Sequence, residues 1–191
     1  SLETVDVRNN TNGLVVVAEN DSIVSGLTTD TVGLKSDADA AVIRAGSSPA
    51  ANATVENLSF ASTGFNQSGG TGLTVTAVGD SEVTNTTLSV VDARGNTNGF
   101  VLSASDTATI SGLDADDAGF RADDSPGLID ASDDAVIANL SFTEARFNDS
   151  TGTGLALSAA GGEIRNLTMD TVDIGNNSIG VSASATGTGL I

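Results

Sequence analysis

Short stretches of the chain place a hydrophobic residue at every second position, with polar or small residues between them. The clearest runs are LTVTA at 73–77, FVLSA at 100–104 and LALSA at 155–159. A period of two with one apolar face is the signature of a β-strand buried on one side. No stretch repeats its apolar residues at the 3.6-residue period of a helix. The pattern therefore predicts an all-β chain built from short strands.

Three columns of apolar residues recur at a fixed spacing, about 27 residues, which lies within the range of known structural repeats. The first is a Gly followed by an apolar residue, at Gly13-Leu14, Gly72-Leu73, Gly99-Phe100, Gly127-Leu128, Gly154-Leu155 and Gly180-Val181, with Ala41-Val42 in the remaining unit. The second contains Val24, Val55, Val83, Ile110, Ile137 and Ile164. The third contains Val7, Leu34, Phe65, Ala93, Phe120, Phe147 and Ile174. All three columns widen once, around 47–53, which predicts a longer surface loop there.

A repeat of this length indicates a stacked repeat architecture. Three short β segments per unit, joined by turns rich in Gly, Asn, Asp, Ser and Thr, predict a β-solenoid. We expect one domain over residues 1–191, with about seven coils of about 27 residues each and three short strands per coil. Leu14, Leu73, Phe100, Leu128 and Leu155 are expected to form one interior stack.

The alternation is ambiguous in two coils, where it would point Arg44 and Asp130 into the interior. An unpaired charge there would cost several kcal/mol. A shift of one residue would instead bury Ile43 and Ala45 in one coil and Ile129 and Ala131 in the other. The sequence leaves both arrangements open.

A further column interchanges Asn and Gly within a recurring phrase, written VENLSF at 55–60, IANLSF at 137–142 and IRNLTM at 164–169. Its members are Gly26, Asn57, Asn85, Gly112, Asn139 and Asn166. Both residue types tolerate the left-handed backbone conformation that β-branched residues avoid. The column therefore predicts a sharp bend between two strands, with inward Asn side chains hydrogen-bonded from coil to coil.

The apolar–x–Asn–x–x–apolar phrase, as at Val55, Asn57 and Phe60, resembles the tight turn of the pectin-lyase-like superfamily. That resemblance extends over all seven coils and implies a right-handed parallel β-helix, of the kind also found in haloarchaeal surface proteins and viral fibres. It implies polysaccharide chemistry only for members with clustered carboxylates, a basic residue and sugar-stacking aromatics.

The net charge of the chain limits the classes of partner that it can bind. The chain has 25 acidic and 7 basic residues and a formal charge of −18. Such a field repels nucleic acid, which excludes it as a partner. Many Asp and one Lys favour a protein adapted to high salt, with an acidic secreted protein as the alternative. The absence of Cys excludes disulfides and thiolate metal sites, and no apolar run is long enough for membrane insertion.

The acids of the segment DADDAGFRADD are the candidates for site chemistry: Asp114, Asp116, Asp117, Asp123 and Asp124. Catalysis would need two or three of them held together beside a groove lined by aromatics, and the chain has no Trp or Tyr. We therefore expect no enzyme activity and assign no catalytic residue. The same acids could bind Ca²⁺ through their oxygens, although solvated turns are the simpler explanation. No other cofactor is expected.

A basic column follows the third segment, with Arg8, Lys35, Arg94 and Arg121 pointing outward. One interpretation is a stripe that binds an anionic glycan. The other is charge pairing with acids such as Asp6 and Asp92.

Asn-x-Ser/Thr sequences, the acceptors of N-glycosylation, occur ten times. Four of them coincide with the Asn/Gly column and are expected to be inaccessible. The candidate acceptors are the other six: Asn9, Asn20, Asn52, Asn66, Asn148 and Asn176.

These patterns favour a structural and adhesive rod of a cell surface, surface layer or viral fibre from a halophile. The alternative is a polysaccharide-binding or polysaccharide-cleaving β-helix. A third idea, an ice- or mineral-binding face, requires a Thr ladder that the scattered Thr residues do not form. Because solenoid ends need caps, we expect a segment of a longer chain or partners docked at both ends. Those partners would be neighbouring coils, other subunits, further copies of the chain or cell-surface glycans.

Overall fold

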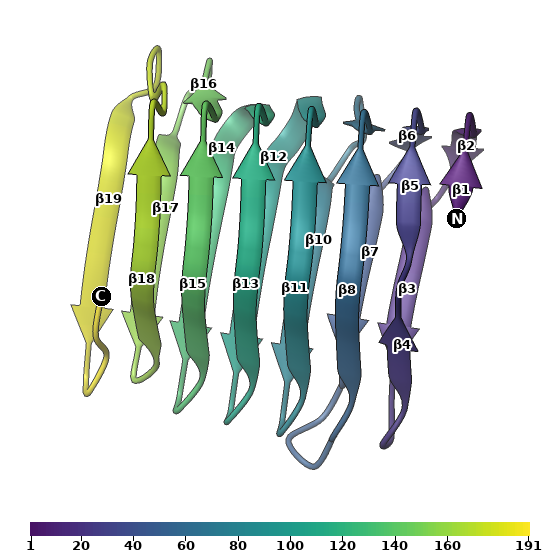
Figure 1. Cartoon of the computed structure of the whole chain (residues 1–191). Coiled ribbons are helices and arrows are strands. Elements are labelled where there is room, and N and C mark those ends of the chain that lie inside the picture. Colours follow the sequence, from purple (N-terminus) through teal and green to yellow (C-terminus); the bar gives the residue numbers. More distant parts are fainter.

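The computed structural model describes residues 1–191 and contains strands and turns but no helix. In Figure 1 the chain rises along the front sheet, crosses at the top and descends along the rear sheet while it advances from the N-terminus to the C-terminus. This path is a right-handed coil. All strand pairings between successive coils are parallel, and about seven coils follow one another along the stack. The predicted right-handed parallel β-helix is therefore confirmed.

The strands form two sheets. The first contains β1 (Leu2–Glu3), β4 (Ile23–Ser25), β5 (Thr28–Asp30), β8 (Thr54–Ala61), β11 (Glu82–Ser89), β13 (Thr109–Asp116), β15 (Val136–Thr143) and β18 (Glu163–Asp170). The second contains β2 (Asp6–Asn10), β3 (Leu14–Ala18), β6 (Gly33–Ser36), β7 (Ala41–Ala45), β9 (Gly64–Phe65), β10 (Thr71–Val78), β12 (Asp92–Ser105), β14 (Gly119–Ser132), β16 (Arg146–Asn148), β17 (Thr153–Ala160) and β19 (Ile179–Thr186).

The three segments expected in each coil are not always separate strands. In β12 and β14 the third segment continues into the first segment of the next coil as one 14-residue strand. The pairing of β12 with β14 shifts register between Arg94 and Asn98, which marks the corner. The widened repeat is the loop between β7 and β8, which Figure 1 shows as the longest turn at the lower edge.

Two apolar columns lie in register through the stack. Val24, Val55, Val83, Ile110, Ile137 and Ile164 are paired directly from coil to coil. In the third column Val7 pairs with Leu34 and Leu34 with Phe65, and Ala93, Phe120 and Phe147 follow in the same way. These pairings place equivalent side chains above one another at the spacing between strands, about 4.8 Å. A continuous interior results.

The first column differs from the expectation at two coils. Ala41 pairs with Leu14 and Leu73, and Gly127 pairs with Phe100 and Leu155. The chain is therefore shifted by one residue in these coils. The prediction that Leu128 belongs to the interior stack was wrong, because Gly127 occupies that place and Leu128 is only half-buried.

The same shift settles the orientation of the two ambiguous charges. Ile43 and Ala45 are buried on β7, and Ile129 and Ala131 are buried on β14. Arg44 and Asp130 each lie between the two buried residues of their strand, so their side chains point outward.

All six Phe residues are fully buried in a core of 41 residues. Phe120 stacks on Phe147 with ring centroids 5.2 Å apart, and Phe100 lies 5.3 Å from Phe120. Phe142 meets Phe147 edge to face, also at 5.2 Å. With few aromatics in the sequence, the core concentrates them in the middle coils, where they supply the largest buried areas.

The Asn/Gly column has the left-handed conformation expected from its residue types. Gly26 and Gly112 have φ of 75° and 69°, and the four Asn residues have φ of 54° or 55°. Asn166 Nδ2 donates to Asn139 Oδ1 at 3.0 Å, and Asn85 Nδ2 donates to Asn57 Oδ1 at 3.3 Å. The expected inward orientation was wrong, because all four Asn side chains are exposed. The left-handed residue turns its side chain outward while the apolar residues on both sides stay inside.

A second left-handed column lies between the first sheet and the third segment, and it contains no Gly or Asn. Its members have φ between 48° and 56°: Thr4, Thr31, Ser62, Val90, Asp117, Glu144 and Thr171. The backbone N–H of each of the first six donates to a carbonyl of the next coil, as Val90 N does to Asp116 O at 3.0 Å. We infer that these inter-coil hydrogen bonds offset the strain of the conformation.

Candidate ligand-binding face

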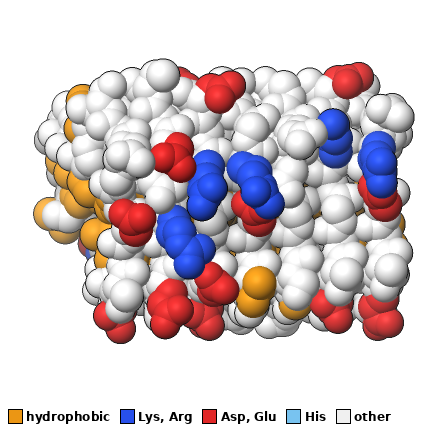
Figure 2. Space-filling model, turned by 90° about the horizontal axis from the view of Figure 1, so that it is seen from above, with side chains coloured by type: hydrophobic (Ala, Val, Ile, Leu, Met, Phe, Trp, Pro, Cys, Tyr) orange, Lys and Arg blue, Asp and Glu red, His pale blue; other side chains and the backbone are white.

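Five of the seven basic residues lie on one side of the coil. This side, called the basic face here, contains Arg8, Lys35, Arg94, Arg121 and Arg146, located on β2, β6, β12, β14 and β16. Figure 2 looks onto it from above and shows the basic side chains gathered over these strands. The strands turn here because the third segment meets the first at a corner. The rest of the surface is strongly acidic, so the basic face differs from it in charge.

The structure brings the predicted basic column together and adds Arg146 to it. Arg94 pairs directly with Arg121 in the sheet, whereas Arg146 pairs with Gly119, two positions before Arg121 in the same strand. Sequence reasoning missed Arg146 because it lies off the column by two positions. A strand turns the same face outward every second residue, and that rule could have placed it.

Neighbouring carboxylates pair with the arginines of this face. Arg8 Nε donates to both Asp6 carboxylate oxygens at 2.7 Å, and Arg94 is 2.5 Å from Asp92. Both pairs join residues i and i+2 of one strand. The hydrogen bond from Arg8 lowers the pKa of Asp6 below its usual value, and the same bond raises the pKa of Arg8. The charge pairing expected from the sequence is therefore present.

Two cations of the basic face have no carboxylate within hydrogen-bonding distance. Arg121 Nε lies 3.7 Å from Asp149, too far for a hydrogen bond. Lys35 forms no salt bridge, and its Nζ donates to Gln67 Oε1 at 2.5 Å. Each of these cations lies in a coil next to a tightly paired arginine. They are the positive charges that an external anion could reach at the least cost.

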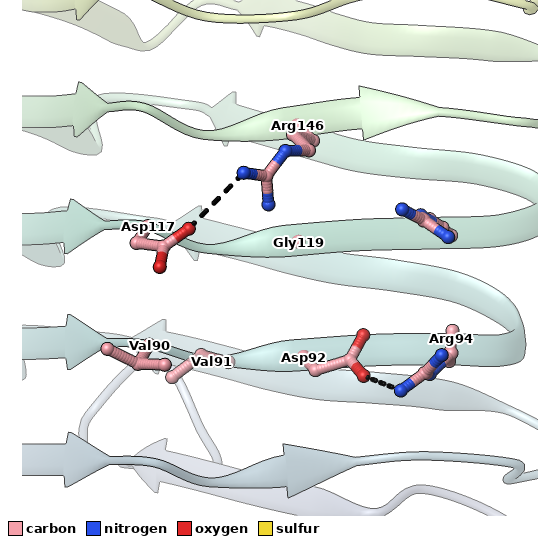
Figure 3. A pocket seen from close by; sticks show the side chains of 8 residues that line it. Val90, Val91, Asp92, Arg94, Asp117, Gly119 and Arg146 are labelled. Atoms are coloured by element: carbon pink, nitrogen blue, oxygen red, sulfur yellow. Dashed lines mark ion pairs between the residues drawn. The ribbon is translucent and has the colours of Figure 1, made fainter.

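Two shallow hollows interrupt the basic face where glycines occupy outward positions. The first, of about 250 Å³, lies over Gly119 and is bordered by Arg94, Arg121 and Arg146. Figure 3 shows the Asp117–Arg146 and Asp92–Arg94 pairs on either side of Gly119. The second hollow, of about 240 Å³, lies over Gly33 and Gly64. Glycine leaves room because no Cβ covers the sheet there.

The charge in each hollow is opposite to that of the whole molecule. Three guanidinium groups and the carboxylates of Asp92 and Asp117 line the first hollow, which gives a formal charge of +1. Arg8, Lys35 and Asp6 line the second, which also gives +1. The complete chain has a charge of −18. The two hollows are thus local exceptions in an acidic field.

The five acids proposed from the sequence as metal ligands do not form a site. Asp114 and Asp116 are exposed on β13, whereas Asp123 and Asp124 are exposed on β14 in the other sheet. Asp117 pairs with Arg146 at 3.4 Å. The structure contains no group of three or more His, Cys, Asp or Glu residues that could hold a metal ion. The geometry does not assemble the calcium site for which these residues were candidates.

The candidate glycosylation residues fall into two groups. Asn9, Asn20, Asn52 and Asn176 are exposed, and Asn66 is half-buried with Oδ1 accepting from Arg94 N at 3.0 Å. The expectation that Asn148 is an accessible acceptor was wrong. The residue is 8% exposed, and its Nδ2 donates to Asp173 Oδ2 at 3.1 Å. The four Asn residues of the left-handed column, expected to be inaccessible, are exposed instead.

Inward Asn side chains do occur, at a corner that the sequence did not reveal. Asn96 is fully buried; its Nδ2 donates to Phe65 O at 2.7 Å and its Oδ1 accepts from Ser68 N at 2.8 Å. Asn177 bonds in the same way to Phe147 O and Ser150 N. Both lie three positions before a Gly of the first column, at Gly99 and Gly180, which is the signal that could have identified them.

The comparisons with known proteins cover the whole chain. No protein-family model, no curated protein and no solved structure matches it. No helix in the structure has the length and apolarity needed to cross a membrane.

Proposed function

We propose that this chain is a structural and adhesive rod of an extracellular assembly, such as a cell surface, a surface layer or a viral fibre, and that its source lives in high salt. The observation that supports a rod most directly is the uninterrupted stacking of parallel coils. Each coil templates the next through backbone hydrogen bonds and interior columns. A solenoid of this kind is a one-dimensional structure whose length grows by coils at about 4.8 Å each.

The charge supports the high-salt part of the proposal. The acidic residues lie mainly on the outside, and 19 of the 25 are Asp. Self-repulsion at −18 destabilises a compact chain of this size in dilute buffer and is screened in concentrated salt. The resemblance to pectin-lyase-like β-helices agrees with a secreted or surface-bound protein.

Apolar side chains are exposed at one end of the described coils. Ile179, Val181, Leu190 and Ile191 are between 43% and 57% exposed, and Figure 2 shows hydrophobic side chains gathered at that end. Open strand edges beside apolar side chains pair readily with other β-structure.

Localisation tests the proposal directly. Antibodies raised against the folded chain, applied as immunogold to thin sections of the source cells or virions, should label the outer surface. Label confined to the cell interior would overturn the extracellular assignment. Incubation of the chain with acidic polysaccharides should release no new reducing ends, and their appearance would favour the polysaccharide-cleaving alternative.

A further inference from the structure

The hollow over Gly119 combines positive charge with an exposed apolar side chain. Val90 lines it beside the three arginines and is 56% exposed. Val90 also has a φ of 53°, a left-handed conformation that is rare for a β-branched residue. Every coil has a left-handed residue at this position, so the conformation belongs to the turn, and Val90 differs from the other members in presenting an exposed apolar side chain. An exposed apolar side chain beside three arginines is the feature that points to a role in binding.

An apolar floor and exposed guanidinium groups fit a specific chemistry. Arginine binds sulfate and carboxylate groups through paired N–H donors. The C–H face of a sugar ring can pack on a small apolar side chain such as Val90. Arg121 is the most available donor, because its nearest carboxylate oxygen, on Asp149, lies beyond hydrogen-bonding distance. A shallow hollow suits a slim chain better than a bulky protein surface.

The second hollow lies in line with the first along the stack. Gly33, Gly64 and Gly119 occupy one outward column, with Gly64 paired to both Gly33 and Asp92, and Asp92 paired to Gly119. The two hollows are thus two to three coils apart, roughly 10–14 Å at the strand spacing. One linear ligand running parallel to the axis would reach both.

We propose that the basic face binds an acidic polysaccharide, with a sulfate or carboxylate group seated in the hollow over Gly119 and another over Gly33 and Gly64. The charge of −18 repels every polyanion at long range, so the proposal rests on the local positive charge of the two hollows and on a ligand slim enough to enter them. This inference rests on the proposed adhesive function, because it names the class of ligand to which the rod would adhere. A rod that binds no acidic glycan would still be a rod.

The test measures binding of defined probes to the folded chain by calorimetry at the lowest salt at which circular dichroism shows native β-structure. The probes are a heparin oligosaccharide for sulfate, an oligogalacturonate for carboxylate and neutral dextran as the control. We expect binding of at least one acidic probe and no binding of dextran. If neither acidic probe binds, or if dextran binds equally well, the proposal is wrong.

Matched variants locate the site. Arg121→Gln should weaken binding about tenfold, because a charge-assisted contact is lost. Arg165→Gln removes the same charge from β18 on the other sheet, where Arg165 is similarly exposed and lies 3.4 Å from Glu163. It should leave the affinity unchanged. Equal losses in both variants would show that only net charge matters, and would overturn the assignment of a site.

Two further variants keep every charge. Gly119→Thr fills part of the hollow; a Cβ there meets nothing nearer than 3.8 Å, and circular dichroism checks that the variant keeps the native fold. It should weaken acidic-probe binding about tenfold, as Arg121→Gln does. Val90→Asn should raise the melting temperature by relieving strain, since Asn tolerates positive φ, and should also weaken binding. Full affinity in both variants would place the ligand elsewhere.

Analytical sedimentation distinguishes glycan binding by the basic face from a protein interface on the same face. It also distinguishes failure of the glycan proposal from failure of the proposed rod function. If Arg121→Gln dissociates an oligomer of the wild-type chain and acidic sugars do not compete, the basic face is a subunit interface and the proposal is wrong. Surface labelling by antibodies would remain expected in that case, so the two failures are distinguishable.

Discussion

Gly127 lies directly against the ring of Phe147, so that a Cβ atom on Gly127 would come within 2.8 Å of the Phe147 Cδ1 and Cε1 atoms. It would also lie 2.9 Å from Leu155 Cδ1. Phe147 continues the ring stack from Phe120 and occupies space that a side chain of the first column fills in other coils. The one-residue shift at Gly127 is therefore the consequence of a large residue in the neighbouring column.

This contact makes Gly127→Ala destabilising. Crowding in a packed core costs about 1–3 kcal/mol, which exceeds the gain of about 0.4–1 kcal/mol from a less flexible unfolded chain. Urea unfolding should show a lower midpoint with an unchanged slope. Gly119→Ala is the matched control, since its Cβ would be 3.8 Å or more from other atoms. A neutral Gly127→Ala would mean that the interior is looser than the ring packing indicates.

The left-handed Asn column predicts that backbone conformation matters more than side-chain size. Asn139→Gly keeps the conformation and loses the hydrogen bond accepted from Asn166, about 1 kcal/mol or less at an exposed site. Asn139→Val places a β-branched residue at a φ of 55°, which adds about 1–3 kcal/mol of strain. Denaturant unfolding of both variants measures the difference. Equal destabilisation would contradict a left-handed bend.

Because Asn96 is buried, replacing it should lower the free energy of unfolding more than replacing any Asn of the exposed left-handed column. Asn96→Ala leaves Phe65 O and Ser68 N without the partners that Asn96 supplies inside the corner, at about 1–3 kcal/mol for each buried group. Asn98→Ala, two positions away, removes a half-buried amide that forms no side-chain hydrogen bond and should cost far less. Thermal and urea unfolding should rank the two variants in that order. The reverse order would refute the buried role of Asn96.

Salt should raise stability. The folded chain holds 18 net negative charges close together, and molar NaCl reduces the screening length to about 3 Å. Screening also weakens the six ion pairs, but these are largely exposed and contribute little. The melting temperature should therefore rise from millimolar to molar NaCl. The double variant Asp114→Asn/Asp116→Asn should need less salt, and an unchanged melting temperature in both proteins would argue against a high-salt adaptation.

The sequence predicted the coil and its period because residues such as Val55, Val83 and Ile110 recur where one face of a strand is buried. It could not place Leu128, since a Gly-Leu doublet looks the same in either register. Which of the two registers the strand adopts depends on the volume of Phe147, which belongs to the next coil of the stack. Packing between coils therefore overrode a local pattern.

The sequence also could not predict the direction in which side chains point at the corners. The phrase around Asn57 identifies a left-handed residue but not the side to which its amide points. The column containing Ser62 and Val90 was invisible, because those residues are poor left-handed formers and their conformation is imposed by inter-coil hydrogen bonds. The basic face was predicted in part, and its hollows required knowing which glycines point outward.

The most direct test of the stacked coil is a disulfide cross-link, which the absence of native Cys makes unambiguous. Thr87 and Asp114 are exposed, belong to adjacent coils and pair directly between β11 and β13. Their Cα atoms should be about 4.8 Å apart, within the range that a disulfide spans. Thr87 and Asp116 are two positions out of register, at about 8 Å, which is too far. Under mild oxidation the variant Thr87→Cys/Asp114→Cys should form an intramolecular disulfide, seen by mass spectrometry, whereas Thr87→Cys/Asp116→Cys should keep free thiols. Equal oxidation of both variants, or faster oxidation of the second, would contradict the parallel register between adjacent coils.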